Sequence, residues 1–125
     1  MSNYMKPKRQ TGNRDPLYAI KENEVVKAVS HWLSLKRIPY WRINTGALKD
    51  RHNRLVRFGS TGMSDIYAIG PNGISIWIEC KRPRGGVVSA AQNEFLDRIN
   101  RHGGIGIVVS SVESLEIQLK EAGVI

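Results

Sequence analysis

Three side chains near the middle of the chain, Asp65, Glu79 and Lys81, have the chemistry needed to hold a divalent metal beside a phosphate. Glu79 and Lys81 stand two residues apart in the segment 74–81, which alternates with the period of a β-strand. A carboxylate and an ammonium group therefore leave one face at the end of that strand, while Cys80 and three isoleucines occupy the other face. Two carboxylates beside a lysine can bind a divalent metal and activate water against a phosphate.

Asp65 can lie near Glu79 and Lys81 only if the chain reverses direction between residues 65 and 79. The segment 66–69 also reads as a strand, and Pro71-Asn72-Gly73 between the two strands is typical of a hairpin turn. A register centred near Asn72 would place Asp65 beside Glu79. The alternative is ordinary, because acids at strand starts and Glu-x-Lys pairs usually form solvated faces or weak surface ion pairs. Trp77 on the face of Glu79 argues against a solvent-exposed strand.

A polar residue interrupts the apolar face of the next predicted helix, which spans residues 89–100 and is ended by Gly103-Gly104. Gln92 shares its face with Phe95, Leu96 and Ile99, so we expect it to point at the sheet. Ser89-x-x-Gln92 also matches a capping box, in which Gln92 returns to the backbone of the N-cap residue. Capping and participation in a site remain open alternatives, and one does not exclude the other.

Together these motifs resemble the PD-(D/E)XK nuclease superfamily: Gly62-Met63-Ser64-Asp65, Glu79-Cys80-Lys81 and Ser89-x-x-Gln92. Arg42-Ile43-Asn44-Thr45-Gly46-Ala47 and the helix Glu22-x-x-Val25 are similar to one of its branches, the virus-type replication-repair nuclease (VRR-NUC) domain. The resemblance covers roughly residues 20 to 110. Ser64 departs from the proline of the superfamily name, but that proline shapes a turn and does no chemistry.

The resemblance implies a role for each matched residue. Asp65 and Glu79 would bind the metal, Mg²⁺ or Mn²⁺, and the backbone carbonyl of Cys80 would be a third ligand. Lys81 would position or help to deprotonate the attacking water and offset charge on the phosphate. Gln92 would complete the site.

Glu22 matches the glutamate that the first helix of the family often adds to the site. It shares a helical face with Val25 and Val29, whereas Glu24 points away from that face. We therefore prefer Glu22 to Glu24. The alternative is a first-turn acid that is favoured only by the helix dipole.

The charge of the chain predicts a nucleic-acid partner. The 125 residues carry 19 Lys and Arg against 11 Asp and Glu, a net charge of +8, of which the first sixteen residues supply +3. Further basic residues flank the motifs, and we expect them to contact DNA: Lys49, Arg51, Arg54, Arg57, Arg82 and Arg84. Such binding should weaken steeply with salt. The alternative is unspecific attraction to any anionic surface. Aromatic residues make up only 7%, so stacking on single-stranded bases is not expected to be prominent.

Periodicity predicts one α/β domain, residues 18–125, behind a flexible basic arm, residues 1–17. The expected elements are a helix over 22–36, a strand over 40–44 and a long basic loop over 45–62 with a short strand at 55–58. The two hairpin strands, the Gln92 helix, a buried strand over 105–109 and a helix through Lys120, capped by Ser110 or Ser111, follow. This αβββαβ order with a mixed central sheet flanked by helices is also the core order of the resembled superfamily.

Other site chemistries find little support in the sequence. Cys80 is the only cysteine and falls on the apolar face, so we expect a core residue. His31, His52 and His102 lack zinc-ligand spacing. No apolar run reaches membrane-spanning length and no secretory signal opens the chain, so we expect a soluble cytoplasmic protein, encoded by a bacterium or phage, without a membrane partner.

The combined expectation is a metal-dependent, structure-selective DNA endonuclease that resolves four-way (Holliday) junctions. Two symmetric cuts require two sites, so we expect a homodimer. One alternative is a monomeric enzyme that nicks flaps or other branched DNA. Another is a DNA-binding module without catalysis, although carboxylates beside phosphates weaken binding unless a cation intervenes.

Overall fold

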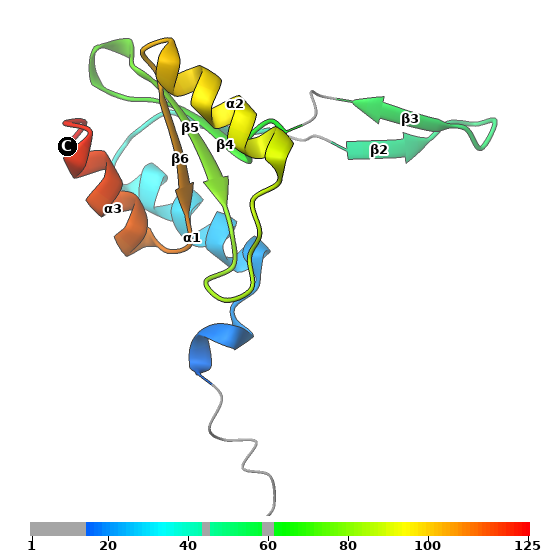
Figure 1. Ribbon diagram of the computed structural model, residues 1–125, viewed down its shortest axis with the longest axis horizontal. Coiled ribbons are helices and arrows are strands. Elements are labelled where there is room, and N and C mark those ends of the chain that lie inside the picture. The colour runs from blue at the N-terminus through cyan, green and yellow to red at the C-terminus, as the bar shows by residue number, and fades with distance from the viewer. Residues whose placement is uncertain (1–14, 44–45, 59–61) are drawn as a thin grey trace, which may run out of the picture.

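The computed structural model describes residues 15–43, 46–58 and 62–125. Figure 1 shows the helices and strands, which follow in the order η1 (Pro16–Ala19), α1 (Glu22–Leu35), β1 (Tyr40–Arg42), β2 (Gly46–Lys49), β3 (Leu55–Phe58), β4 (Ile66–Ile69), η2 (Pro71–Gly73), β5 (Ser75–Cys80), α2 (Ala90–Arg101), β6 (Ile105–Val109) and α3 (Val112–Glu121).

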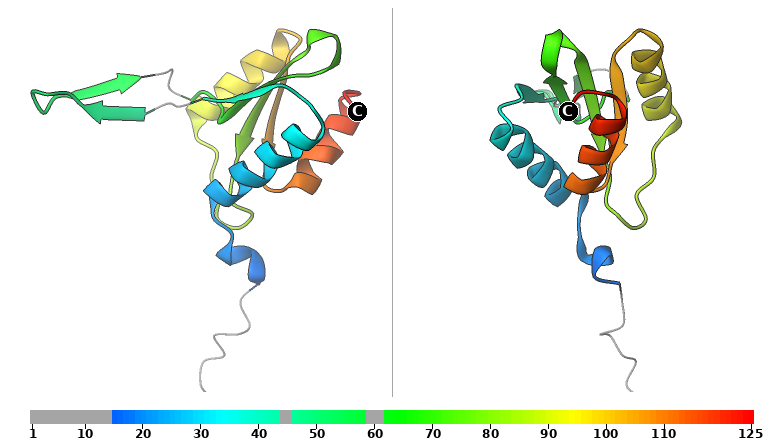
Figure 2. Two further views of the ribbon diagram at one scale, coloured as in Figure 1. Left: turned by 180° about the vertical axis from the view of Figure 1, so that it is seen from behind. Right: turned by 90° about the vertical axis from the view of Figure 1, so that its left-hand side faces the viewer.

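Four strands form a mixed sheet in the order β1-β4-β5-β6. Strand β4 runs antiparallel to β1 and β5, whereas β5 and β6 are parallel and joined through α2. Helices α1 and α3 cover one face of this sheet and α2 covers the other (Figure 2). The prediction of an α/β domain with a mixed sheet between helices is confirmed at this level.

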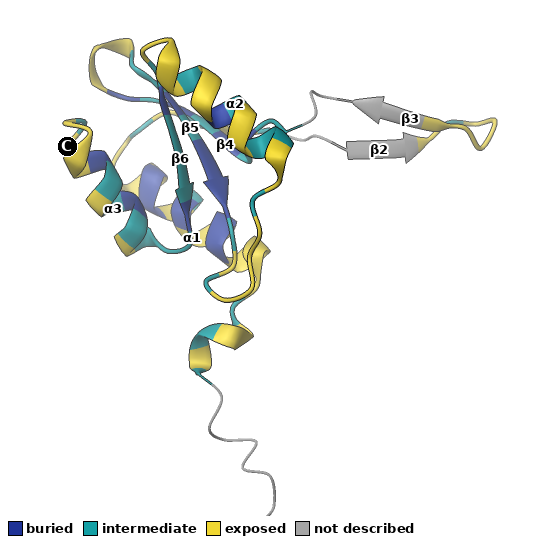
Figure 3. Ribbon diagram, viewed as in Figure 1, coloured by how far each residue is buried: buried dark blue, intermediate teal, exposed yellow. Residues whose placement is uncertain are grey.

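The hydrophobic core lies between the sheet and the α1–α3 pair, where the ribbon is darkest in Figure 3. Alternation along β4 and β5 puts their apolar residues on this face, including the fully buried Ile66, Ile76 and Ile78. Leu33 of α1 and Leu115 of α3 close over them and are also fully buried. Burying each such side chain is worth roughly 1.5–3 kcal/mol, so this face fixes α1 against the end of β5.

The predicted hairpin positions the candidate site. Its turn is η2, where Asn72 and Gly73 take positive φ values of 61° and 76°. The register pairs Ile66 with Ile78 and Ile69 with Ser75. One step beyond the first pair, Asp65 falls opposite Glu79, as a turn centred near Asn72 requires.

The predicted loop over 45–62 is in part a second hairpin. Strands β2 and β3 pair with each other and stand away from the main sheet (Figure 1). The carboxylate of Asp50 closes the turn by accepting from the backbone N–H groups of His52 (2.8 Å) and Arg54 (2.9 Å). The strand at 55–58 was expected, but β2 was not, because Gly-Ala-Leu-Lys has low strand propensity.

Helix ends follow local signals. Ser89 caps α2 and Ser111 caps α3, and Gly103 takes a φ of 84° just beyond α2. The strand predicted over 40–44 ends at Arg42 in the structure, and Asn44, the last residue of the prediction, lies outside the described residues. Of the arm predicted over 1–17, residues 1–14 lie outside the described residues, and residues 16 and 17 belong to η1.

Two side chains form hydrogen bonds with backbone groups on the free edge of β6. The Asn100 amide donates to the carbonyl of Gly106 (3.0 Å) and accepts from its N–H (2.8 Å). The amide of Gln118 donates to the carbonyl of Val108 (2.8 Å). Backbone groups that a neighbouring strand would otherwise bond are thereby paired within the chain.

Within the ranges that the structure describes, no helix combines the length and the apolar character needed to cross a membrane.

Candidate active site

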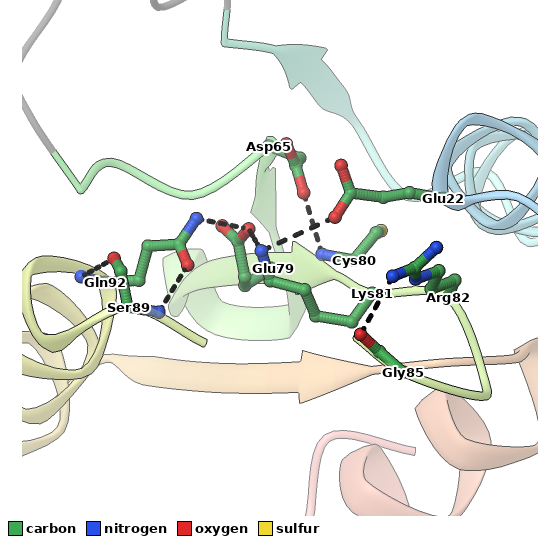
Figure 4. Close-up of polar contacts among 9 residues, drawn as sticks. All are labelled: Glu22, Asp65, Glu79, Cys80, Lys81, Arg82, Gly85, Ser89 and Gln92. Carbon is green, nitrogen blue, oxygen red and sulfur yellow. Dashed lines mark hydrogen bonds and ion pairs between the residues drawn. The ribbon is translucent and has the colours of Figure 1, made fainter. Parts of the chain in front are cut away.

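Five predicted side chains gather at the carboxyl end of β5, between the first turns of α1 and α2 (Figure 4). Asp65 is the residue before β4, Glu79 is the second-last residue of β5, and Lys81 directly follows β5. Glu22 opens α1, and Gln92 lies in the first turn of α2. The structure thus brings together residues that the sequence spreads over 71 positions, from 22 to 92.

The two carboxylates are fixed by backbone and side-chain donors. Asp65 Oδ2 accepts from the backbone N–H of Cys80 (2.8 Å). Glu79 is only 2% exposed, and its Oε1 accepts from Gln92 Nε2 (2.9 Å). Its Oε2 is buried and has no hydrogen-bond partner among the described residues. A buried carboxylate oxygen without a donor is costly unless a cation meets it.

Lys81 bridges two acids. Its Nζ lies 3.3 Å from Glu79 Oε1 and 3.4 Å from Glu22 Oε1, and the side chain is 15% exposed. Glu22 therefore joins the cluster, as predicted. Glu24 instead accepts from the backbone N–H of Lys21 at the start of α1 (3.3 Å).

Burial and crowding raise the pKa of both central carboxyl groups. Burial, followed by repulsion from Asp65, raises the pKa of Glu79 to about 7, against the attraction of Lys81. Burial also raises the pKa of Asp65, and the Cys80 N–H opposes it. For Lys81, burial lowers the pKa, but attraction to Glu79 and Glu22 outweighs it and leaves the pKa raised. The ammonium group is thus charged at neutral pH, whereas Glu79 takes up a proton easily.

Gln92 caps α2 and also contacts Glu79, so the two alternatives that the sequence left open are geometrically compatible. Its side-chain Oε1 accepts from the backbone N–H of Ser89 (2.9 Å), and its backbone N–H donates to Ser89 Oγ (3.1 Å), which completes the capping box. The side-chain NH₂ group of Gln92 donates to Glu79. Because capping directs the oxygen toward the backbone, the NH₂ group is left to face the carboxylate.

Cys80 is a core residue, as expected. Its thiol is buried on the α1–α3 face, and burial raises its pKa, which disfavours the thiolate form. The N–H and C=O groups of one strand residue point to the same side. Because the Cys80 N–H meets Asp65, its carbonyl is directed to that side too.

These donors suit a hard divalent cation. Within residues 15–43, 46–58 and 62–125, no three histidine, cysteine or acidic side chains form a cage on their own. Mg²⁺ typically uses one or two carboxylates and keeps water or phosphate oxygens as its other ligands. Asp65, Glu79 with its partnerless oxygen, and the Cys80 carbonyl would form such an open set of oxygen ligands.

Comparison with protein-family models, with characterised proteins and with solved structures finds no match for this chain.

A hollow of about 600 Å³ adjoins Lys81 on the side away from Gln92. Its walls come from η1, the start of α1 and the loop after β5. Three basic side chains and one acid line it, Lys21, Lys81 and Arg82 with Glu22, together with the exposed Tyr18 and Val87. No pattern in the sequence predicts this hollow, because η1 and the loop are far apart along the chain and neither is periodic.

The predicted DNA contacts differ in the partners that their side chains already have. Lys49 and Arg51 are exposed on the β2–β3 hairpin, and Arg51 Nε donates to His52 Nε2 (3.3 Å). Arg54 forms an ion pair with Asp50 (3.1 Å), and Arg84 forms one with Asp15 (2.8 Å). Arg82 donates to the carbonyl of Gly85 (3.1 Å). Arg57 lies in β3, and its side chain is outside the described part of the chain.

A row of aromatic rings on the face of Asp65 and Glu79 was not predicted. It runs from Trp41 through Tyr67 to Trp77, which meets Phe95 of α2. The register that pairs Asp65 with Glu79 also pairs Tyr67 with Trp77. The hairpin turn at residues 71–73 that brings the carboxylates together therefore also brings these two rings together.

Proposed function

We propose that the protein is a metal-dependent DNA endonuclease of the PD-(D/E)XK type, similar to VRR-NUC domains. The observation that carries the proposal is the position of Lys81, held between Glu79 and Glu22 while Asp65 lies opposite Glu79. A structural ion pair needs one acid. Three acids around one lysine, two of them with raised pKa values, form a strained arrangement that suits cation binding.

The roles of the residues follow from their contacts. Asp65, Glu79 and the Cys80 carbonyl would hold Mg²⁺ or Mn²⁺, which when bound lowers the pKa of a water ligand and stabilises charge on a phosphate. Lys81 remains protonated and offsets the charge that develops on the phosphate. Gln92 donates to Glu79 Oε1 and leaves Oε2 without a partner, so Oε2 would be the oxygen that holds the cation.

DNA is favoured over a small phosphate ester by the surroundings of the site. The chain carries a net charge of +8, and basic side chains line the hollow beside Lys81 and the β2–β3 hairpin. Phosphate contacts of this kind position a duplex without reading its sequence. Selectivity would then come from the shape of branched DNA, and we propose the four-way junction as substrate.

Paired cuts across a four-way junction require two sites, so we propose that the active form is a homodimer. Light scattering and a cruciform plasmid test this. A dimer should linearise the plasmid, because opposing strands are cut within one encounter. A monomer at micromolar concentration that gives only nicked plasmid would instead support nicking of flaps or other branched DNA.

Metal titration tests the catalytic proposal. Wild-type protein, Asp65→Asn and Asp97→Asn would be incubated with four-way, flap and linear DNA over increasing Mg²⁺ or Mn²⁺. Asp97 is an exposed acid on α2, so its variant is a control with the same loss of charge. We expect Asp65→Asn to abolish cleavage while binding DNA as tightly as the wild type or more tightly, and Asp97→Asn to cleave normally.

Two outcomes would contradict the proposal. Cleavage by Asp65→Asn at ordinary metal concentration would remove Asp65 from the chemistry. Metal-dependent binding without cleavage of any substrate by the wild type would leave a DNA-binding module.

A further inference from the structure

A column of aromatic rings crosses the sheet next to the candidate site. The ring centroids of Trp41 and Tyr67 are 5.8 Å apart with 25° between their planes, and those of Tyr67 and Trp77 are 4.6 Å apart at 33°. Phe95 of α2 makes a T-shaped contact with Trp77 at 5.2 Å. The column begins under α2 and ends at Trp41 in β1, the edge strand of the sheet.

Trp41 is fixed but not covered. It is 51% exposed, whereas Trp32 in the core is 7% exposed and donates its indole N–H to Glu116 (2.8 Å). Stacking on Tyr67 holds the ring of Trp41 in place, so a ligand that stacks on it costs little side-chain entropy. An exposed and pre-oriented aromatic ring is the usual stacking surface for a nucleobase.

The column and the carboxylates lie side by side on one face. Trp41, Tyr67 and Trp77 are cross-strand neighbours; Asp65 lies two residues before Tyr67, and Glu79 lies two residues after Trp77. Two strand residues span roughly 7 Å and neighbouring strands are about 4.8 Å apart, so Trp41 lies about 8 Å from Asp65 along the diagonal. One nucleotide can bridge this distance. The next residue of β1, the exposed Arg42, pairs with the core residue Ile66, so its side chain leaves the opposite face of the sheet.

We propose that Trp41 stacks on an unpaired base of the DNA strand whose phosphate is held at Asp65 and Glu79. This inference rests on the proposed nuclease function and narrows its substrate. Inside a continuous duplex, both faces of each base are covered by its neighbours, so extracting one costs unstacking energy. The preferred substrate is therefore DNA with an unpaired base beside the cut, at a flap or an open junction centre.

A second copy of the chain is a poorer occupant for this ring. Stable protein interfaces bury about 800 Å² on each partner, far more than one indole provides.

Tryptophan fluorescence tests the proposal without catalysis. Wild type, Trp41→Phe, Trp41→Ala and the control Leu35→Ala, which alters an exposed apolar residue of α1, would be titrated with single-stranded oligothymidylate and with blunt duplex in the presence of EDTA. We expect oligothymidylate to quench wild-type emission more than duplex does. Trp41→Phe should lose most of the quenching and keep its affinity, because phenylalanine also stacks. Trp41→Ala should bind oligothymidylate roughly ten- to a hundredfold more weakly, while Leu35→Ala behaves as the wild type.

The remaining outcomes separate this inference from the proposed function. Equal affinity of Trp41→Ala and wild type for oligothymidylate would overturn the stacking proposal even if the wild type cleaves branched DNA. A change from dimer to monomer in Trp41→Ala would also overturn it, because a second copy would then cover the ring. Quenching that depends on Trp41, in a protein that cleaves nothing, would uphold stacking and overturn the nuclease.

Discussion

Lys81 is the residue whose surroundings are hardest to explain by stability alone. It is 15% exposed and shared between Glu79 and Glu22, so much of its hydration is replaced by carboxylates. If its role is electrostatic stabilisation at a phosphate, Lys81→Ala should lower the single-turnover rate by a factor on the order of a hundred or more. Single-turnover cleavage beside thermal melting measures this.

Lys120→Ala is the matched control for Lys81, because Lys120 is exposed in the last turn of α3. It should leave the rate unchanged. A Lys81→Ala protein that melts lower but cleaves at the wild-type rate would reduce Lys81 to a structural role.

The raised pKa of Glu79 predicts how stability depends on pH in metal-free protein. An unfolded glutamate has a pKa near 4.5, whereas folding raises the pKa of Glu79 to about 7. The folded state then binds the extra proton, so this contribution is complete below about pH 4.5 and is lost as the pH rises through about 7. The loss amounts to roughly 3 kcal/mol, and the raised pKa of Asp65 acts in the same direction.

Urea unfolding in EDTA from pH 4.5 to 8 measures this loss. Glu79→Gln should flatten the profile, because it keeps the shape but removes the titration. Mg²⁺ at pH 8 should stabilise the wild type and have little effect on the variant. Wild-type stability that increases with pH over this window would contradict the environment described for Glu79.

The two bonds of Gln92 can be separated with its capping partner. Ser89→Ala removes the hydroxyl that accepts from the Gln92 N–H and should cost about 1 kcal/mol of stability with near-normal turnover. Gln92→Ala removes the donor to Glu79 as well, so it should lower turnover in addition. Melting temperatures and single-turnover rates of both variants test this. Equal turnover in the two proteins would leave Gln92 as a cap only.

Residue spacing predicted which side chains gather at the site. The hairpin positions Asp65 and Glu79, the face of α2 positions Gln92, and the first turn of α1 positions Glu22. Residue spacing did not predict the partnerless oxygen of Glu79, since burial at that atom depends on α1 and α2 closing over β5 together. The small share of aromatic residues in the composition predicted that stacking would not be prominent. The strand register nevertheless places three aromatic rings in one row.

At the scale of elements, β4, β5, α2 and β6 were predicted from alternation, turn residues and helical spacing. The β2–β3 hairpin was recognised only in part, because its first strand lacks β-branched residues. The 3₁₀ turn η1 was not foreseen. It begins with Asp15 as N-cap and is connected to the loop after β5 through Arg84, a contact across 69 positions.

This connection makes a prediction about Arg84. Asp15 partly neutralises Arg84, and the N–H of Leu17 together with Arg84 holds the pKa of Asp15 below its usual value. If Arg84 contacts DNA, Asp15→Asn should strengthen binding and Arg84→Ala should weaken it, each by about two- to fivefold. Fluorescence anisotropy with a labelled four-way junction measures both. Weaker binding in both variants would mean that the ion pair only orders η1.

For the whole molecule, the charge predicts the salt dependence of binding. Residues 1–14 carry Lys6, Lys8, Arg9 and Arg14 and no acid, a charge of +4. Deleting them should weaken junction binding and make the plot of log affinity against log salt less steep, by about one unit for each phosphate that the arm no longer neutralises. Anisotropy titrations from low to high salt measure the slope.

A full-length protein with these four basic residues replaced by glutamine is the charge control. It should behave like the truncated chain. An unchanged slope in both proteins would assign the phosphate contacts to the body of the domain alone.

The bonded edge of β6 also affects how the chain behaves before and after folding. Ile105-Gly106-Ile107-Val108-Val109 is the kind of short apolar strand that seeds intermolecular β-aggregation. Asn100 and Gln118 bond the N–H and C=O groups of Gly106 and the C=O group of Val108, three of the backbone groups at which a foreign strand would add. These two amides come from the helices on either side of β6, so the protection exists only once α2 and α3 have docked. The folded protein is therefore guarded against strand addition at this edge, and the hazard is confined to the interval before those helices are in place.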